Sequence, residues 1–456
     1  MSTRTLARDL AALVGEEAVL SEPPVTYLED ATFTRGVRGF ADAVVLPSTS
    51  DEVARVVRWC YEHDVPIVPR GGGTGYAGGA VPFGGVVVAL ERMRRVREFE
   101  PLFWRIEVES GLTTWELRRL VRDNGLVFPP NPGAGEQSQV GGNVATNAGG
   151  PHAFKYGVVG RWVTGLEVVV PPGEVMQTGG AVRKDTAGYD LKSLLVGSEG
   201  TLGIVTGVWL RLLPAPERVL TVAAAYSSAE AGCDAIETVY GSGIQPAALE
   251  YFDDVTLHHT RAAFPVELPP EAGFLVAAEA DGSTAEADRA ASELVEALSS
   301  GALGVHRPSP VEVWRWRDGV SFTMAGVLGR KLAGDLAVPP DRLREMIAAT
   351  EEVGARHGVE VCSWGHAGDG NVHANVLFPP DDAGAESAAV AAAEELADRA
   401  VALRGTISGE HGVGVLKAAQ LEKQLDAASL ELQRQIKRVF DPKGLLNPGK
   451  KIPARR

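Results

Sequence analysis

The chain has few cysteines, and they lie far apart. Among its 456 residues the three cysteines are Cys60, Cys233 and Cys362. An odd number of cysteines with no Cys-x-x-Cys spacing excludes a disulfide framework, and it excludes an iron–sulfur cluster held by this chain alone. We therefore expect the protein in a reducing compartment, the cytoplasm.

Long apolar runs and an excess of basic charge are also missing. No apolar run reaches the roughly 18 residues of a membrane-spanning helix, so we expect no membrane span. Lys and Arg number 44 against 59 Asp and Glu, a formal net charge of −15. Nucleic acid and anionic membrane surfaces bind basic proteins, so neither is expected as the main partner. With 45% hydrophobic residues the chain is typical of a folded protein of two or three domains.

Helix and strand patterns alternate along the chain and divide it at a proline-rich point. Residues 214–217 read Pro-Ala-Pro-Glu, a sequence that ends regular structure. Beyond it a strand–helix–strand pattern occurs twice, which predicts a smaller α+β domain whose antiparallel sheet carries helices on one face. We expect domains at 1–214 and 215–420, and a helical C-terminal segment at 421–456 that packs back on the first domain.

A glycine-rich segment, Pro69–Gly79, contains the spacing G-x-G-x-x-G at Gly73, Gly75 and Gly78. In a Rossmann fold this turn opens a crossover helix, but only AVPFGG separates Gly79 from the next expected strand. Six such residues cannot form that helix, so the Rossmann interpretation fails. A run of small residues after a strand instead exposes backbone N–H groups, which bind anions such as pyrophosphate.

Two further segments, 129–150 and 196–206, are rich in small residues in the same way. Together, and in this order, the three segments resemble the flavin-binding domain of the vanillyl-alcohol oxidase/p-cresol methylhydroxylase family. The resemblance implies an α+β protein with a two-subdomain FAD-binding domain and an α+β cap domain that binds the substrate. It implies non-covalent FAD, because residues 71–75 hold no histidine for a covalent link. The implied FAD-binding residues are Arg70, Gly71, Gly72, Gly73, Thr74, Gly75, Gly78, Gly79, Ala80, Pro132, Gly133, Ser138, Gly142, Asn143, Asn147, Glu199, Gly203, Ile204 and Val205.

A histidine pair in the second region has the pattern of a metal site. The dipeptide Asp369-Gly370 predicts a two-residue hairpin turn, which places His366 opposite His373 on one face of a sheet. Two imidazoles at that spacing suit one divalent metal, although a hairpin with two exposed histidines is the plain alternative. A glycine-flanked pair, Glu410 and His411, offers a carboxylate as third ligand, and such a set leaves a catalytic metal an open position.

These motifs, H-x-G-D-G-N-x-H and G-E-H-G, with the C-terminal N-P-G-K, resemble the flavin enzymes that oxidise D-2-hydroxy acids. The resemblance implies zinc or manganese bound by His366, His373 and Glu410, with His411 as the catalytic base. It also implies Arg317 and Lys331 as the cations for the substrate carboxylate.

The expected function is therefore oxidation of a D-2-hydroxy acid, D-lactate or glycolate first, to the 2-oxo acid with hydride transfer to flavin. Two alternatives stay open: a non-redox transferase of the ether-lipid synthase type, and a flavin subunit of a multi-subunit glycolate oxidase. Because no cluster motif is present, electrons leave the flavin for a quinone, a cytochrome, an electron-transfer flavoprotein or a partner subunit. Membrane association through that acceptor is left open, as is the oligomeric state.

Overall fold

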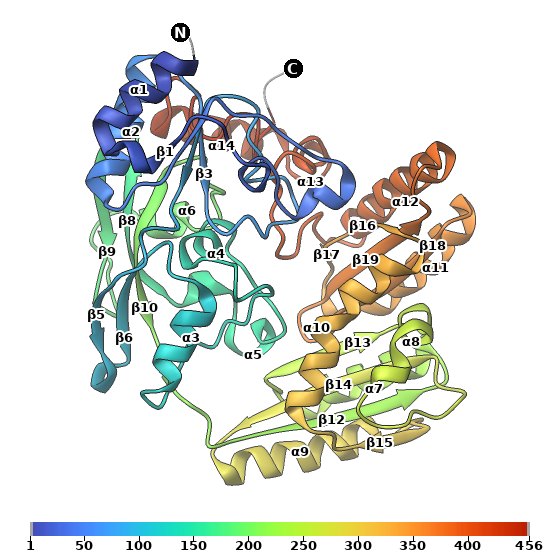
Figure 1. Cartoon of the computed structure of the whole chain (residues 1–456). Helices are drawn as coiled ribbons and strands as arrows, with labels where there is room; N and C mark the ends of the chain where they lie inside the picture. The colour runs from blue at the N-terminus through green and yellow to red at the C-terminus, as the bar shows by residue number, and fades with distance from the viewer. Residues whose placement is uncertain (1–2, 454–456) are drawn as a thin grey trace. The chain divides into compact units, whose positions relative to one another are not determined.

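The computed structural model describes residues 3–453, which fold as two compact units (Figure 1). Unit 1 comprises Met1–Ala148, Val158–Ala215 and Glu410–Arg456, and unit 2 comprises Gly149–Gly157 and Pro216–Gly409. Each unit is described by itself. The domain boundaries expected after residues 214 and 420 stay predictions.

Unit 1 contains two main sheets. The first is mostly parallel, with order β1-β2-β4-β3, and the second is antiparallel, with order β5-β6-β10-β8-β9. A short pair, β7 with β11, completes the strands of this unit. Their bounds are β1 Val19–Leu20, β2 Ala43–Val45, β3 Ile67–Arg70, β4 Val86–Ala89, β5 Val96–Glu100, β6 Arg105–Glu109, β7 Leu126–Val127, β8 Val163–Val170, β9 Glu174–Gly179, β10 Ile204–Arg211 and β11 Leu213–Pro214.

Helices α1 and α2 cover the first sheet of unit 1. The apolar face of α2 buries Val53, Val57 and Cys60 against the strands, and Thr49 caps its first turn by accepting from the Glu52 N–H. The same core includes Leu446, so the C-terminal segment packs into this unit. The helices are α1 Thr3–Val14, α2 Ser50–Glu62, α3 Thr114–Arg122, α4 Val140–Thr146, α6 Leu191–Leu195, α13 Leu421–Gln424 and α14 Ala427–Phe440.

Unit 2 is built on one eight-stranded sheet of order β15-β12-β14-β13-β18-β19-β16, with β17 paired beside β19. All of these pairs are antiparallel, as expected for the cap domain. The strands are β12 Arg218–Tyr226, β13 Ala248–Phe252, β14 Phe274–Gly282, β15 Gly304–His306, β16 Arg330–Ala333, β17 Leu336–Ala337, β18 Glu360–His366 and β19 Asn371–Phe378.

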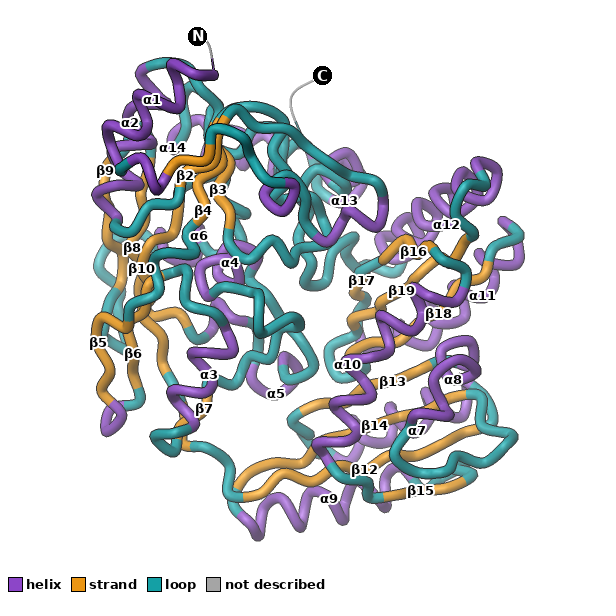
Figure 2. The backbone as a smooth tube through the Cα atoms, in the orientation of Figure 1, coloured by secondary structure: helices purple, strands orange, loops and turns teal. Residues whose placement is uncertain are grey.

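Helices cover both faces of this sheet, so the expectation of helices on one face is wrong (Figure 2). Ala223 and Ala225 of β12 pack in one cluster with Trp316 of α10, whereas the Tyr226 hydroxyl donates to Leu298 O at the end of α9. The end of β12 is buried on both sides, and a strand apolar on both faces needs two covering layers. The helices are α5 Ala153–Tyr156, α7 Ala229–Ser242, α8 Asp254–Thr260, α9 Thr284–Leu298, α10 Pro310–Val327, α11 Leu343–His357 and α12 Ala383–Ala402.

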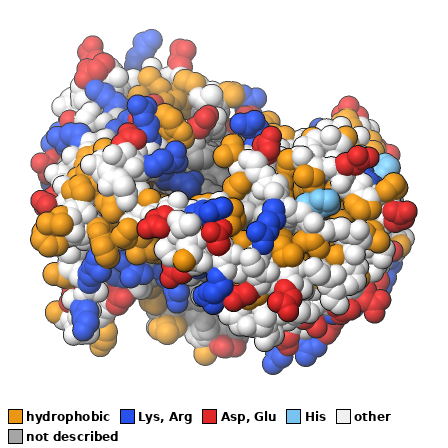
Figure 3. Space-filling view, turned by 90° about the horizontal axis from the view of Figure 1, so that it is seen from below, with side chains coloured by type: hydrophobic (Ala, Val, Ile, Leu, Met, Phe, Trp, Pro, Cys, Tyr) orange, Lys and Arg blue, Asp and Glu red, His pale blue; other side chains and the backbone are white. Residues whose placement is uncertain are grey.

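The described helices and one face of the molecule bear on the expectations about membranes and nucleic acid. Within residues 3–453, no helix is both long enough and apolar enough to cross a bilayer. On the face drawn in Figure 3, Lys and Arg side chains form small groups separated by acidic and hydrophobic ones. This face therefore lacks the continuous positive surface that nucleic acid attracts.

Candidate active site

The glycine-rich loops of unit 1 approach one another closely. A Cβ atom on Gly71 would lie 3.3 Å from the Cα of Gly142, and one on Gly72 would lie 2.0 Å from Gln137 O. The first and second small-residue segments are thus in backbone contact, which only glycine allows at Gly72. The sequence brings these segments together because small residues let two main chains pack without side chains between them.

Arg70 ends strand β3 at the entrance of the first loop. Its Nη2 atom donates to Thr26 O at 2.5 Å, and the guanidinium lies over the Tyr27 ring. Its Nη1 atom is buried and, among the described residues, has no hydrogen-bond partner. Burial lowers the pKa of Arg70, with neighbouring Asp30 opposing that shift. A buried cation with an unused donor beside a glycine loop fits an anionic group such as a pyrophosphate.

Three polar side chains expected to line the cofactor are bonded within the protein. Ser138 and Asn143 both bond the Thr114 hydroxyl of α3, at 2.7 and 2.6 Å. Asn147, in the left-handed conformation with φ of 50°, accepts from the Gly160 N–H at 2.9 Å. These contacts position the second loop. Direct contact of these side chains with FAD stays a prediction.

Glu199, which is predicted to bind FAD, holds a segment near the end of the chain. Its carboxylate accepts from the backbone N–H groups of Val413 and Gly414, at 2.8 and 2.6 Å, and from Lys451 Nζ at 3.1 Å. Asn447 Nδ2 donates to Glu199 O and to Gly79 O, which joins the third loop to the first. The motif N-P-G-K therefore holds the glycine-rich loops together within unit 1.

The remaining predicted cofactor residues of unit 1 fall into two groups. A Cβ atom added to Gly75 or Gly133 would meet no atom within 4 Å, so both lie beside open space. Gly203 instead packs tightly on Val168, and Ile204 lies in the hydrophobic core. The open space beside Gly75 and the unused donor of Arg70 fit a bound phosphate-containing cofactor. For the whole first loop, and for three residues of the other segments, contact with FAD stays a prediction. The first-loop residues are Arg70, Gly71, Gly72, Gly73, Thr74, Gly75, Gly78, Gly79 and Ala80, and those of the other segments are Pro132, Gly142 and Val205.

In unit 2 the hairpin forms, but its register differs from the expected one. Trp364, rather than His366, faces His373 across the strand pair. The reason is that the turn takes the four residues 367–370 instead of the two expected, with Gly370 at φ of +77°. A shift of two residues keeps side chains on the same face, so the imidazoles lie on a diagonal with ring centroids 5.1 Å apart.

Two aromatic side chains hold this turn. The Tyr240 hydroxyl donates to Gly368 O at 2.5 Å, and the Phe154 ring lies against Gly368, where a Cβ atom would come within 2.4 Å of it. Phe154 and Tyr240 also contact each other edge to face, with centroids 5.6 Å apart. The hairpin that carries both histidines is therefore fixed at its tip by packing as well as by its strand pairing.

A buried carboxylate links one of these histidines to a predicted substrate cation. Glu250 of β13 faces His366 of β18 directly, and its Oε1 atom lies 2.5 Å from His366 Nδ1. Its Oε2 atom accepts from Arg317 Nε of α10 at 3.0 Å. Burial alone would raise the pKa of Glu250, but His366 and Arg317 lower it below the ordinary value. Glu250 is 0% exposed and was not singled out by sequence.

Lys331, the second predicted cation, lies on strand β16 and is largely buried. Its Nζ atom donates to the Ser321 hydroxyl at 2.6 Å and to Ser321 O at 3.2 Å, and it lies over the Trp364 ring. Burial lowers the pKa of Lys331 to about 8. Ser321 is one helical turn after Arg317 on α10, so both cations lie where α10 meets the sheet.

Asp335 is a second buried carboxylate that sequence analysis did not assign. It accepts from Asn371 Nδ2 at 2.9 Å and from the Ser408 hydroxyl at 3.0 Å. It thereby ties the start of β19 to the segment before the G-E-H-G motif, which also bridges β17 through Thr406 and Ala337. Its place in the stretch KLAGDLAVP, four residues after Lys331, was the signal that could have found it.

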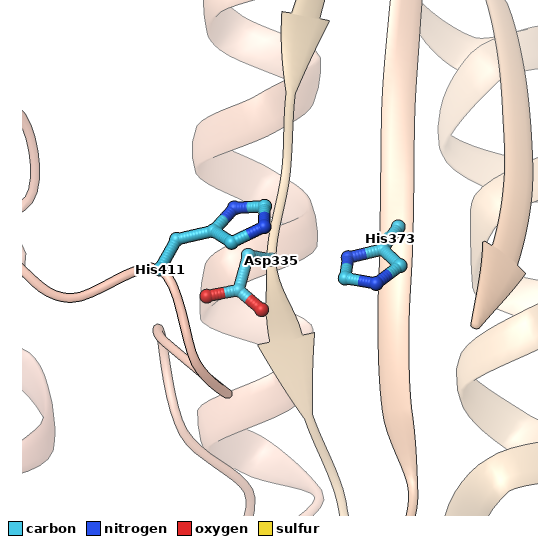
Figure 4. Close-up of side chains that lie close together, drawn as sticks. All are labelled: Asp335, His373 and His411. Carbon is cyan, nitrogen blue, oxygen red and sulfur yellow. The ribbon is translucent and has the colours of Figure 1, made fainter. Parts of the chain in front are cut away.

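Ligand atoms of two sets of three side chains lie within 4.8 Å of one another. One set is His366, His373 and Glu410, the three residues predicted to bind metal. The other is Asp335, His373 and His411, shown in Figure 4. Nitrogen and carboxylate donors of this kind suit zinc or manganese, so the residues fit a divalent ion.

His411, the predicted base, has an aromatic neighbour that sequence analysis missed. The ring of Tyr76, inside the first glycine-rich loop, stacks on His411 with centroids 4.9 Å apart and planes 30° from parallel. Glu410 and His411 are themselves close, with 4.0 Å between His411 Nε2 and Glu410 Oε1. An aromatic residue in an otherwise small-residue loop was the available signal.

Comparison with known proteins identifies the class. A family model for the FAD binding domain matches residues 41–179, and one for the C-terminal domain of FAD linked oxidases matches residues 215–451. The chain belongs to the FAD-linked oxidases, a family of flavoprotein enzymes.

Individual relatives cover nearly the whole chain. Glycolate oxidase subunit GlcD of Bacillus subtilis (strain 168) is 36% identical over 435 residues, which cover 93% of this chain and 92% of the relative. D-lactate dehydrogenase of Anaerostipes hadrus is 32% identical over 423 residues, which cover 90% and 89%. The solved structure of p-cresol methylhydroxylase with substrate bound has a TM-score of 0.81 at 18% identity, covering 99% of this chain and 97% of that chain. This likeness confirms the fold expected from the three small-residue segments.

Proposed function

We propose that the protein oxidises a small D-2-hydroxy acid, with D-lactate and glycolate as the first candidates, to the 2-oxo acid. The observation that carries this proposal is the group His366, His373 and Glu410, whose ligand atoms lie within 4.8 Å of one another. Glycine-rich loops suited to a pyrophosphate support FAD as the cofactor. The names of the two relatives support the substrate class.

When bound, the divalent ion supplies Lewis-acid chemistry and FAD supplies the acceptor for hydride. His366, His373 and Glu410 would hold the ion, zinc or manganese, and leave it open to the hydroxyl and carboxylate oxygens of the substrate. His411 takes the hydroxyl proton at a ring nitrogen, a transfer that imidazole performs near neutral pH. Arg317 and Lys331 bind the substrate carboxylate, Arg317 with the planar geometry that suits two oxygens.

The reduced flavin passes its electrons on without an iron–sulfur cluster bound by this chain. A quinone, a cytochrome, an electron-transfer flavoprotein or a partner subunit is the acceptor, and the subunit name of the Bacillus relative supports the last of these. We place the protein in the cytoplasm, with any membrane contact made through that acceptor. The FAD is non-covalent, because residues 71–75 contain no histidine.

The test is the visible spectrum of the purified protein, recorded anaerobically before and after D-lactate, glycolate and D-2-hydroxyglutarate are added in turn. We expect a yellow protein that one of these acids bleaches. A yellow protein, supplied with zinc and then with manganese and bleached by none of them, would contradict the proposed reaction and favour a non-redox transferase. A colourless protein that FAD does not reconstitute would contradict the cofactor.

A further inference from the structure

Glu250 has no role in the reaction as described so far, yet both of its oxygens contact residues that do. It lies in the middle of an otherwise apolar strand, β13 with the sequence ALEYF, and 0% of its surface is exposed. One oxygen lies 2.5 Å from His366 Nδ1 and the other 3.0 Å from Arg317 Nε. All of these contacts lie within unit 2.

The chemistry of the carboxylate restricts both partners. An ionised carboxylate accepts hydrogen bonds and cannot donate them, so His366 Nδ1 must carry the proton in this contact. The other ring nitrogen, Nε2, then keeps the lone pair with which a metal is bound. On the other side, Nε is the guanidinium nitrogen that Glu250 occupies, so the two Nη atoms of Arg317 remain to meet a second carboxylate.

We infer that Glu250 is a positioning residue that holds His366 as an Nε2 metal ligand and aims Arg317 at the substrate carboxylate. One rigid group would thus set the spacing between the metal and the cation that the substrate must bridge. The inference rests on the proposed function, because it takes the roles of His366 and Arg317 from there.

A role in stability alone explains the arrangement less well. Removing two charges from water is costly, and replacing a buried ion pair by apolar residues of similar volume is often neutral or stabilising. A fold that needed only packing at this point would use a residue like Leu249 or Phe252, its neighbours on β13. A carboxylate that touches two functional side chains at once is better explained by what it orients.

The variant Glu250→Gln tests this inference because it keeps the shape and removes one acceptor. If the amide oxygen accepts from Arg317 Nε, the amide NH₂ faces His366 Nδ1, which must then lack its proton. The proton moves to Nε2, and the metal ligand is lost. If the amide is reversed, its NH₂ group faces Arg317 Nε. Both groups are donors, so the hydrogen bond that orients Arg317 is lost.

The primary measurement is zinc affinity of the chelator-stripped FAD protein, by isothermal titration with zinc chloride. We expect the variant to bind zinc about 10- to 100-fold more weakly than the wild type, as other outer-shell changes do. The apparent KM for the bleaching acid should rise about tenfold, because one amide orientation disturbs the metal ligand His366 and the other disturbs Arg317, and the substrate needs both. Glu109→Gln is the matched control: it also removes a buried, arginine-paired carboxylate, but in unit 1 and on β6, and zinc affinity should not change.

The outcomes separate this inference from the proposed function. Zinc affinity and KM equal to wild type in Glu250→Gln would overturn the role of Glu250 while leaving the metal site standing. A wild-type protein that binds neither zinc nor manganese would overturn the metal site and the His366 part of this inference together.

A second measurement on the wild type guards against a variant that fails to fold. ¹⁵N-histidine NMR of the metal-free protein, with the His366 signals assigned by their loss in His366→Gln, reads the tautomer directly. A proton on Nδ1 supports the inference, and a neutral ring with its proton on Nε2 overturns it.

Discussion

The glycine-rich loops of unit 1 and the sheet face of unit 2 prepare for ligands in different ways. In unit 1 the polar side chains bond to the protein itself, as Ser138, Asn143 and Asn147 do, and the backbone of the first glycine-rich loop, residues 71–75, is the proposed contact for a ligand. In unit 2 the backbone is consumed by strand pairing, and side chains such as His366 and His373 project from the sheet. Loops therefore suit a cofactor with phosphates, and a sheet face suits a small substrate that is bound by few, fixed groups.

A buried glutamate in each region, Glu199 in unit 1 and Glu250 in unit 2, holds its surroundings in a different way. Glu199 accepts from two backbone N–H groups, those of Val413 and Gly414. Glu250 accepts from two side chains, His366 and Arg317. The first therefore fixes where a loop runs, whereas the second fixes how side chains point. Variants at the two regions should accordingly separate cofactor binding from catalysis.

The largest effect is expected from removing a residue of the proposed metal site, either His373 of unit 2 or Glu410. In His373→Ala, and likewise in Glu410→Gln, flavin should stay bound while its reduction by substrate slows by about 1,000-fold or more, because a metal supplies several kcal/mol. Anaerobic stopped-flow spectra measure the reduction, and flavin released by heat measures occupancy. Reduction at the wild-type rate in His373→Ala would remove the metal from the mechanism.

The opposite pattern is expected in unit 1. A Cβ atom at Gly75 would meet no protein atom within 4 Å, so Gly75→Val should leave the fold intact and exclude FAD from the loop. The absorbance ratio at 450 and 280 nm, about 450 nm being where oxidised flavin absorbs, measures the occupancy. Gly241→Val, at an exposed and equally open helix position, serves as control and should keep its flavin. Full occupancy in Gly75→Val would show that the cofactor lies elsewhere.

A smaller effect should follow from weakening the loop anchor. Glu199→Gln leaves one of two backbone N–H groups without a carboxylate oxygen and removes the partner of Lys451, which should lower the free energy of unfolding by about 1–3 kcal/mol. Urea unfolding followed by fluorescence measures it. The exposed Glu174→Gln should change stability by no more than about 0.5 kcal/mol. Equal stabilities of the two variants would mean that the Glu199 contacts carry no weight.

The smallest effect concerns pH. Because the pKa of Lys331 is lowered to about 8, the ammonium is charged below that pH and neutral above it. If Lys331 binds the substrate carboxylate, KM should rise a few-fold as the pH increases through about 8. Lys331→Arg, which stays charged, should lose this dependence. A wild-type KM that is constant from pH 7 to 9 would remove Lys331 from the substrate site.

The sequence predicted what local pattern determines. The strand–helix–strand pattern predicted the antiparallel cap sheet, and the family resemblance of the three small-residue segments implied the FAD-linked fold. The comparisons confirm the family and the fold. The hairpin was predicted at Asp369-Gly370, but its register was wrong by two residues, because the turn takes four residues instead of two. The prediction that both histidines share a face still holds, because side chains of a strand alternate between its two faces and a shift of two residues keeps the same face.

What the sequence could not predict depends on pairing between distant segments. Glu250 and His366 are neighbours because β13 pairs with β18, which lie 116 residues apart at this contact. The hydrophobic periodicity within a segment does not indicate which distant strand it pairs with. Similarly, the contacts of Glu199 with Val413 and Gly414 join segments more than 200 residues apart and could not be predicted, whereas its contact with FAD stays a prediction. A charged residue inside an apolar strand was the one signal in the sequence that could have pointed to Glu250.

The burial of all three cysteines gives the molecule a built-in reporter of its own opening. Cys60 lies in the core of unit 1, and Cys233 and Cys362 are buried in unit 2, where burial raises the pKa of each thiol. A thiol reagent can modify them only when the surrounding structure opens, since the reactive thiolate is both rare and covered. The rate of labelling at Cys60 against that at Cys362, read by mass spectrometry, thus measures how often each unit unfolds locally, with no engineered probe.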